Sequence, residues 1–214
     1  NFRIKAGVQR YAAEAGIIVV SPDTSPRGED VPDDPDYGYG QGAGFYLDAT
    51  QEPWSEHFNM YSYILKDLLS VLESNFPADM KRLGIFGHSM GGHGALTIAF
   101  KNPELFKSVS VFSPICAPTK APWGEKAFAR YLGEDTNLWQ DYDACDLVRA
   151  KGWPNDILID QGEDDEYLAD HLKPELLEQA CEEKGVAIKF RKHAGYDHSY
   201  FFVSTFIGDH ILWH

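Results

Sequence analysis

Cysteine and long apolar stretches are both scarce in this 214-residue chain. Its three cysteines, Cys116, Cys145 and Cys181, are widely spaced and odd in number, so they form neither a disulfide framework nor a zinc-binding pattern. This cysteine usage favours a reducing, intracellular setting. No apolar run reaches the length of about 18 residues that a membrane span needs, so the sequence predicts no transmembrane helix.

Positive charge is also scarce, because 19 lysines and arginines stand against 33 aspartates and glutamates, for a net charge of −14. This balance argues against binding to a nucleic-acid backbone or to an anionic membrane surface. Hydrophobic residues make up 43% of the chain and charged residues 24%, an ordinary globular composition. We therefore expect one domain over residues 1–214 with a substantial core.

An initiator methionine is missing, and the chain opens at Asn1 with a segment that has helical apolar spacing. Phe2, Val8 and Tyr11 fall near one face of this helix, and Gly16 provides a C-terminal stop. We expect the sequence to begin inside a domain whose N-terminal strands precede residue 1.

Apolar patterning predicts strands that alternate with helices along the chain. The predicted strands are 17–20, 83–86, 108–113, 156–160 and 187–191, and the later helices are 57–76, 89–102, 126–132, 171–184 and 200–214. The run at 17–20 is β-branched throughout and predicts a fully buried parallel strand. This alternation indicates an α/β domain with a mostly parallel sheet flanked by helices.

Two regions lack such regular patterning. Residues 24–56 are too long for an ordinary connection, so they form either a functional or a disordered loop, and their aromatic residues favour a packed one. Residues 116–154 hold three tryptophans among polar residues. They either cap an active site or form a packed excursion from the sheet.

Ser89 lies between the predicted strand 83–86 and the following helix, inside the pattern Gly87-His88-Ser89-Met90-Gly91. Strand, sharp turn and helix are the context of a G-x-S-x-G nucleophile elbow. Gly87 and Gly91 are expected to remove Cβ atoms that would clash in this turn. The N–H of Met90 would be one oxyanion donor at the positive end of the helix. A glycine-rich connection without catalytic function is the alternative.

A serine nucleophile needs a base, and the base needs an orienting carboxylate. The strand at 156–160 is followed by a cluster of acidic residues, from which we choose Asp165, with Asp164 as the second choice. The strand at 187–191 is followed by His198, the candidate general base. Both loops follow the carboxyl ends of their strands, where open α/β sheets place their chemistry.

Other histidines fit the role of base less well. His88 and His93 flank the elbow but cannot easily turn back onto Ser89, so we expect them to pack beside the site. No H-x-x-x-H or H-E-x-x-H pattern occurs, so we expect no metal site.

Three stretches carry a family resemblance: GHSMGGHGAL around Ser89, DILIDQGEDDEYL around Asp165 and GYDHSYFF around His198. Together with GAGFYLDAT, SPICAP and PWGEKAF, they resemble S-formylglutathione hydrolase, also called esterase D. The likeness extends over nearly the whole chain. It implies an α/β-hydrolase fold and gives Ser89, Asp165 and His198 the roles of nucleophile, acid and base.

The resemblance further implies hydrolysis of the thioester S-formylglutathione to glutathione and formate, as in formaldehyde detoxification. Side activity on short acyl esters, a cytoplasmic location, the absence of a cofactor and a possible homodimer are implied as well. One departure concerns a Gly-Leu-Thr-Cys-Thr-Asp-Glu stretch that the family usually has just before the Asn-Phe at residue 1. In the family, this stretch follows a strand that lies in the sheet between the strands corresponding to 17–20 and 83–86. It supplies the second oxyanion donor, which we therefore expect upstream of residue 1.

Alternative functions stay open at this point. They are a general carboxylesterase, an acyltransferase on the same fold, and a non-catalytic hydrolase-fold binding protein. An anionic substrate would need a local basic patch, for which Lys120, Lys126 and Arg130 are candidates.

Overall fold

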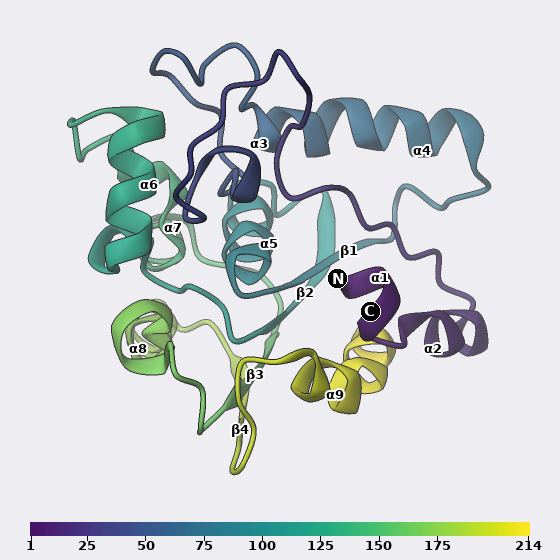
Figure 1. Ribbon diagram of the computed structural model, residues 1–214. Helices are drawn as coiled ribbons and strands as arrows, with labels where there is room; N and C mark the ends of the chain where they lie inside the picture. Colours follow the sequence, from purple (N-terminus) through teal and green to yellow (C-terminus); the bar gives the residue numbers. More distant parts are fainter.

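Four parallel strands form the central sheet of the computed structural model, which describes all 214 residues (Figure 1). The strands are β1 (Leu83–His88), β2 (Phe106–Phe112), β3 (Ile157–Gly162) and β4 (Ile188–His193), hydrogen-bonded in that order. Four of the predicted strands are thus found, and the prediction of an α/β class with a parallel sheet is confirmed.

Helices cover both faces of this sheet and the ends of its strands. They are α1 (Phe2–Lys5), α2 (Val8–Ala15), α3 (Met60–Ser62), α4 (Leu69–Asn75), α5 (Met90–Lys101), α6 (Pro122–Leu132), α7 (Ala144–Lys151), α8 (Pro174–Lys184) and α9 (Tyr200–Trp213). Short helical turns are η1 (Gly40–Gly42), η2 (Tyr63–Leu68), η3 (Pro118–Lys120), η4 (Trp139–Tyr142) and η5 (Leu168–Leu172).

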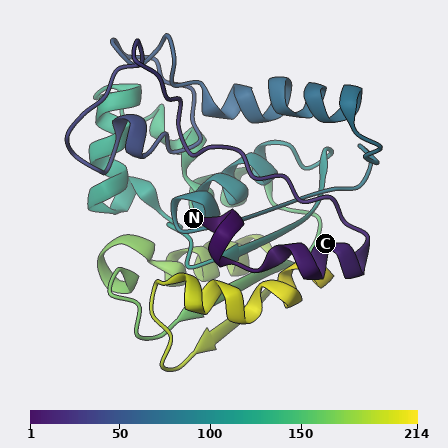
Figure 2. The same ribbon diagram turned by 45° about the vertical axis from the view of Figure 1, so that its right-hand side comes forward.

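Side chains of β2 alternate between two apolar clusters, as the pleat of a strand requires. Val109 and Val111 pack with α5, α7 and α8 in the larger cluster, whereas Phe112 packs with Phe202 of α9. Helix α5 is buried on every side from Gly92 to Phe100, which explains its apolar sequence. Figure 2 shows α9 beside α2 on the opposite face of the sheet.

The long segment 24–56 is a packed loop, as its aromatic content predicted. Phe45 and Trp54 of this loop are buried in a third apolar cluster together with Phe58 and with Phe128 and Tyr131 of α6. The Tyr131 hydroxyl donates to the carbonyl of Ala43 at 2.7 Å, which fixes the loop over the helix. The irregular region 116–154 is likewise folded, because α6 and α7 account for much of it.

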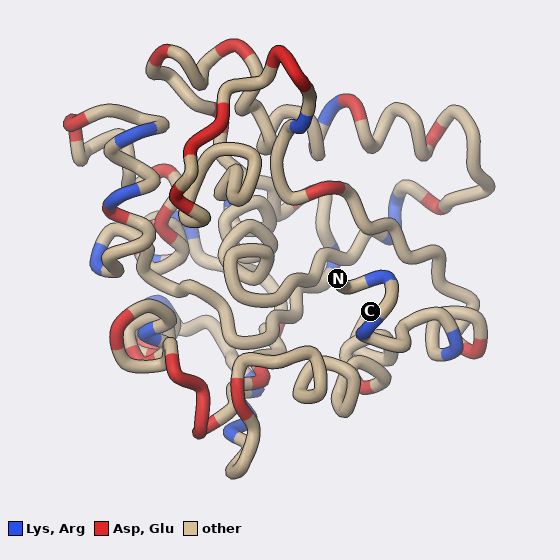
Figure 3. Tube along the Cα trace, in the orientation of Figure 1, with Lys and Arg blue, Asp and Glu red and all other residues tan.

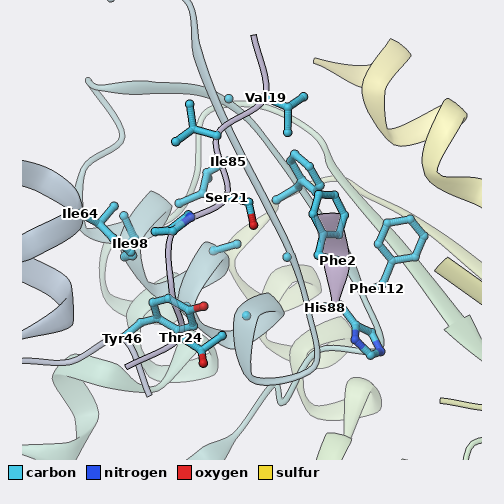
Figure 4. A pocket seen from close by; sticks show the side chains of 18 of the residues that line it. Phe2, Val19, Ser21, Thr24, Tyr46, Ile64, Ile85, His88, Ile98 and Phe112 are labelled. Atoms are coloured by element: carbon cyan, nitrogen blue, oxygen red, sulfur yellow. The ribbon is translucent and has the colours of Figure 1, made fainter. Parts of the chain in front are cut away.

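The predicted strand at 17–20 is wrong. These residues make no hydrogen bond to β1, and Ile18 and Val20 are 50% and 40% exposed rather than fully buried. A cavity of about 1370 Å³ separates them from β1. Figure 4 shows Val19 on one side of it and Ile85 of β1 on another. A β-branched run becomes a strand only beside a backbone that can pair with it.

Two predicted helices also differ from the structure. The first is broken at Gly7, which has a left-handed φ of 69°, although it ends at Gly16 as expected. The helix predicted over 57–76 begins at Met60, because residues 54–58 form a tight turn closed by a hydrogen bond from Phe58 N to Trp54 O.

A buried ion pair joins α9 to the sheet. Asp160 of β3 is fully buried, and Arg191 of β4 binds its two oxygens at 2.5 Å each while also contacting Asp209 of α9 at 2.6 Å. Burial would raise the pKa of Asp160, but the nearby His210 ring and the hydrogen bonds from Arg191 hold it at about 2. The network anchors the two strands that lead into the acidic loop and the histidine loop.

Acidic residues gather on the first part of the long loop, from residue 29 to residue 36 (Figure 3).

No helix of the structure is both long and apolar enough to cross a membrane.

His93 of α5 provides a prediction about acid stability. It is fully buried, faces the Phe45 carbonyl through Nε2 at 3.0 Å, and has its pKa lowered by burial from 6.5 to about 4. Unfolding therefore takes up a proton at acid pH, so stability present above pH 6.5 is lost as the pH falls toward 4. His93→Gln keeps a hydrogen-bond donor but does not titrate. Between pH 7 and pH 5, its free energy of unfolding should fall by about 2 kcal/mol less than that of the wild type.

Urea unfolding at the two pH values measures this difference. His57→Gln, in the turn before α3, is the matched control and should lose as much stability as the wild type. Equal losses in His93→Gln and the wild type would contradict the prediction.

Candidate active site

Ser89 sits at a strained turn between β1 and α5. Its φ is 59° and its ψ is −119°, a conformation that residues other than glycine rarely adopt. Its N–H donates to the Phe112 carbonyl at 3.0 Å, and its own carbonyl accepts from His93 N at 3.0 Å and Ile115 N at 3.3 Å. These bonds from β2, α5 and the next loop hold the turn in place, as a nucleophile elbow requires.

The glycines of the elbow differ in what they are needed for. A Cβ on Gly87 would lie 2.1 Å from the Gly91 carbonyl oxygen, so no other residue fits there. Gly91 itself has no positive φ, and its Cβ would meet nothing closer than the Tyr46 hydroxyl at 3.9 Å. The expectation that Gly91 removes a clash is therefore wrong. Gly94, outside the motif, is a second position without room for a side chain, because its Cβ would lie 2.4 Å from the Tyr46 ring.

His198 and Asp165 are brought together at the carboxyl ends of β3 and β4. His198 Nδ1 lies 2.6 Å from Asp165 Oδ2. The same oxygen accepts from Gln161 Nε2 at 3.2 Å, and Asp165 Oδ1 accepts from the backbone N–H of Tyr167 at 2.9 Å. Between the two candidates from the acidic cluster, the structure thus pairs Asp165, and not Asp164, with the histidine.

Asp165 is ionised in this environment. Burial would raise the pKa of Asp165, but the hydrogen bond and charge of His198 together with the Tyr167 N–H bring it below its ordinary value. An ionised carboxylate at Nδ1 fixes the ring tautomer and leaves Nε2 of His198 able to accept a proton.

Two aromatic rings hold the His198 imidazole. The His88 ring lies 4.5 Å from it between centroids, and the Tyr167 ring meets it edge-on at 4.9 Å. Burial and the neighbouring His198 charge lower the pKa of His88 to about 3, so this second histidine stays neutral. His88 packs beside the site, as the sequence predicted.

Ser89, Met90 and His198 line one end of the cavity that runs along β1, together with Trp123 and Tyr167. His88 is labelled at this end in Figure 4. No hydrogen bond joins the Ser89 hydroxyl to the His198 ring in this structure. Such bonds often tighten only when substrate binds. Met90 is the first residue of α5, so its N–H has no acceptor within the helix and is available to an anion.

The three candidate basic residues do not line this cavity. Lys126 is paired with Asp36 of the long loop, and Lys120 and Arg130 lie outside the cavity wall. They therefore do not contribute to the wall of the cavity at Ser89, and their role as a basic patch for an anionic substrate stays a prediction. The structure also contains no group of three or more His, Cys, Asp or Glu side chains arranged to hold a metal ion.

Sequence reasoning missed the contacts of Tyr167 and Gln161 with Asp165. Tyr167 follows Asp165 by two residues, and a turn after an aspartate commonly brings such an N–H to its carboxylate, so that signal was present. The sequence signal for Gln161 was weaker, because a single polar side chain at the end of an apolar strand has many explanations.

Comparison with known proteins adds a second line of observation. The Esterase family model matches residues 1–213. The curated S-formylglutathione hydrolase of Paracoccus denitrificans is 54% identical over 214 residues, covering all of this chain and 76% of that protein. The S-formylglutathione hydrolase of Rattus norvegicus is 51% identical, covering all of this chain and 77% of that protein.

A solved structure is similar over the same extent. It is the S-formylglutathione hydrolase from Agrobacterium tumefaciens, with a TM-score of 0.98 and 53% sequence identity. The match covers all of this chain and 78% of that one. The α/β-hydrolase fold expected from the sequence is thereby confirmed.

The two elbow glycines give a direct prediction. Gly87→Ala should destabilise the protein by about 3 kcal/mol, because its Cβ would overlap a backbone oxygen. Gly91→Ala should be neutral or raise stability by up to about 1 kcal/mol, since alanine favours a helix and has room here. Urea unfolding of both variants checks this, and equal destabilisation of the two would contradict it.

Proposed function

This chain belongs to the Esterase family and, within it, to the S-formylglutathione hydrolases, and we propose that it performs their reaction with Ser89, Asp165 and His198 as its catalytic residues. It is a serine hydrolase that cleaves the thioester S-formylglutathione to glutathione and formate. The single observation that carries the assignment of residues is the 2.6 Å contact between His198 and Asp165 at the cavity end that also contains Ser89.

In the first half of the reaction, His198 Nε2 takes the hydroxyl proton of Ser89 as the serine oxygen attacks the formyl carbon. The carbonyl oxygen becomes an oxyanion, which the Met90 N–H stabilises at the N-terminus of α5. Collapse of this intermediate breaks the C–S bond. The glutathione thiolate leaves with the proton from His198, and a formyl ester remains on Ser89.

In the second half, His198 accepts a proton from water as the water oxygen attacks the formyl ester. The intermediate collapses to formic acid, which ionises to formate in solution, and His198 returns its proton to the Ser89 oxygen. Asp165 stays ionised throughout and stabilises the imidazolium that forms in each half. The neutral His88 ring adds no positive charge beside that imidazolium.

Short acyl esters should be secondary substrates, since the same attack on a carbonyl carbon applies to them. A general carboxylesterase is the second candidate, favoured by the apolar rings of Trp123 and Tyr167 at the cavity end, which suit many small acyl groups. Comparing kcat/KM for S-formylglutathione and p-nitrophenyl acetate separates the two. A higher value for the ester would favour the general carboxylesterase.

Removal of the nucleophile tests the catalytic assignment. Ser89→Ala should lower p-nitrophenol release from p-nitrophenyl acetate by at least about 10³-fold, because no other group can carry the acyl intermediate. Labelling with a fluorophosphonate probe is the complementary measurement, with the adduct expected on Ser89. Retained activity in the variant, or an adduct elsewhere, would overturn the assignment.

Location and assembly are further proposals. All three cysteines are buried and unpaired, which supports a reducing compartment such as the cytoplasm. Large apolar side chains on α1 and α9 are exposed, Ile4 by 80% and Phe201 by 84%, which supports a homodimer that covers them.

Sedimentation of the wild type and of Phe201→Ser checks the proposed homodimer. The variant should dissociate at concentrations where the wild type is dimeric. A wild type that stays monomeric at high concentration would contradict the proposal.

A further inference from the structure

Gln161 is a buried polar residue in a strand whose six residues are all buried. It lies near the end of β3, before the loop that carries Asp165, and is 1% exposed. A buried amide destabilises a protein unless its polar atoms find partners. The partners of this amide therefore indicate what it is for.

The amide nitrogen of Gln161 has two acceptors. Nε2 lies 3.0 Å from the Gly162 carbonyl oxygen and 3.2 Å from Asp165 Oδ2. Neither a carbonyl nor an ionised carboxylate can donate, so the atom that faces them has to be the NH₂ group. This chemistry fixes the orientation of the amide and leaves Oε1 buried without a hydrogen-bond partner.

The unpartnered oxygen argues that stability alone does not explain this residue. An apolar side chain of the same length would fill the site without leaving a buried acceptor unsatisfied. A residue that lowers stability and yet contacts a reacting group is typical of a functional position. The contact concerned is the one with Asp165.

Asp165 Oδ2 is the oxygen that His198 Nδ1 also contacts, at 2.6 Å. Asp165 Oδ1 is occupied by the Tyr167 N–H. Gln161 thus donates to the same carboxylate oxygen that His198 contacts. Every donor to Oδ2 draws negative charge away from the bond to His198.

We propose that Gln161 is a positioning residue for the acid: it holds Asp165 Oδ2 against His198 and moderates the pull of that oxygen on the imidazole proton. The proposal rests on the proposed roles of Asp165 and His198. Without the amide, the carboxylate would favour the protonated imidazole more strongly. A higher pH would then be needed to obtain the neutral ring that accepts the Ser89 proton.

Gln161→Met tests this, because methionine keeps the length of the side chain and removes both polar atoms. We expect kcat on p-nitrophenyl acetate to fall about tenfold with KM within about twofold, since the change acts on the base and not on substrate binding. The midpoint of the acid limb of log kcat/KM against pH should rise by about half a unit.

Ile159→Val is the matched control. Ile159 is also buried in β3, two residues earlier on the same face, and it belongs to the apolar cluster away from Asp165. This variant should change thermal stability without moving the acid limb. Gln161→Glu is the second variant: a carboxylate at this position adds negative charge beside Asp165, so the midpoint should rise by more than in Gln161→Met.

An acid limb that stays at the wild-type midpoint in Gln161→Met and Gln161→Glu overturns the inference and makes the residue merely structural. The inference is also overturned if the acid-limb midpoint of Ile159→Val shifts by as much as that of Gln161→Met. If Gln161→Met fails to fold, the midpoint of Gln161→Glu decides. A wild type without activity, or Ser89→Ala with activity, refutes the proposed function itself, and that outcome is distinct from an unmoved midpoint.

Discussion

The left-handed backbone at Ser89 is the constraint on which the site depends. A non-glycine residue with a φ of 59° carries strain on the order of 1–3 kcal/mol. Three backbone hydrogen bonds from β2, α5 and the loop after β2 keep it there. The elbow is therefore a product of the sheet register as much as of its own sequence. The same register brings the ends of β3 and β4 to its side.

Burial gives the histidines of this protein different tasks. His93 and His88 are deprived of water, so their pKa values lie well below the ordinary one and they serve as neutral packing and hydrogen-bonding groups. His198 instead meets an ionised carboxylate through one nitrogen while the other is left for substrate chemistry. Asp160 and Asp165 differ in a comparable way. Asp160 is held by an arginine to anchor the sheet, whereas Asp165 orients a base.

Local patterns predicted what local physics determines. Short apolar runs located β1 to β4. The loops after the predicted strands 156–160 and 187–191 located Asp165 and His198, which the structure pairs. The run at 17–20 failed because a strand exists only beside a pairing backbone, and a cavity lies there instead.

Contacts between segments that are distant in the chain could not be predicted from the sequence for a similar reason. The partner of Lys126 is 90 residues away in the chain, so its charge could not be recognised as already paired. The direction of the Gln161 amide depends on how the acidic loop returns to β3. The freedom of Gly91 and the crowding of Gly94 depend on where Tyr46 lies, 48 residues before Gly94.

The crowding of Gly94 by Tyr46 has a consequence for how such sequences diverge. The ring occupies a notch in α5 that exists only because position 94 has no side chain, so the two positions are coupled by volume. A larger residue at 94 becomes acceptable only after the ring at 46 has been lost, and the reverse order of replacement passes through a clash. In an alignment of relatives, positions 46 and 94 should therefore covary, and glycine at 94 should be retained wherever an aromatic residue stands at 46.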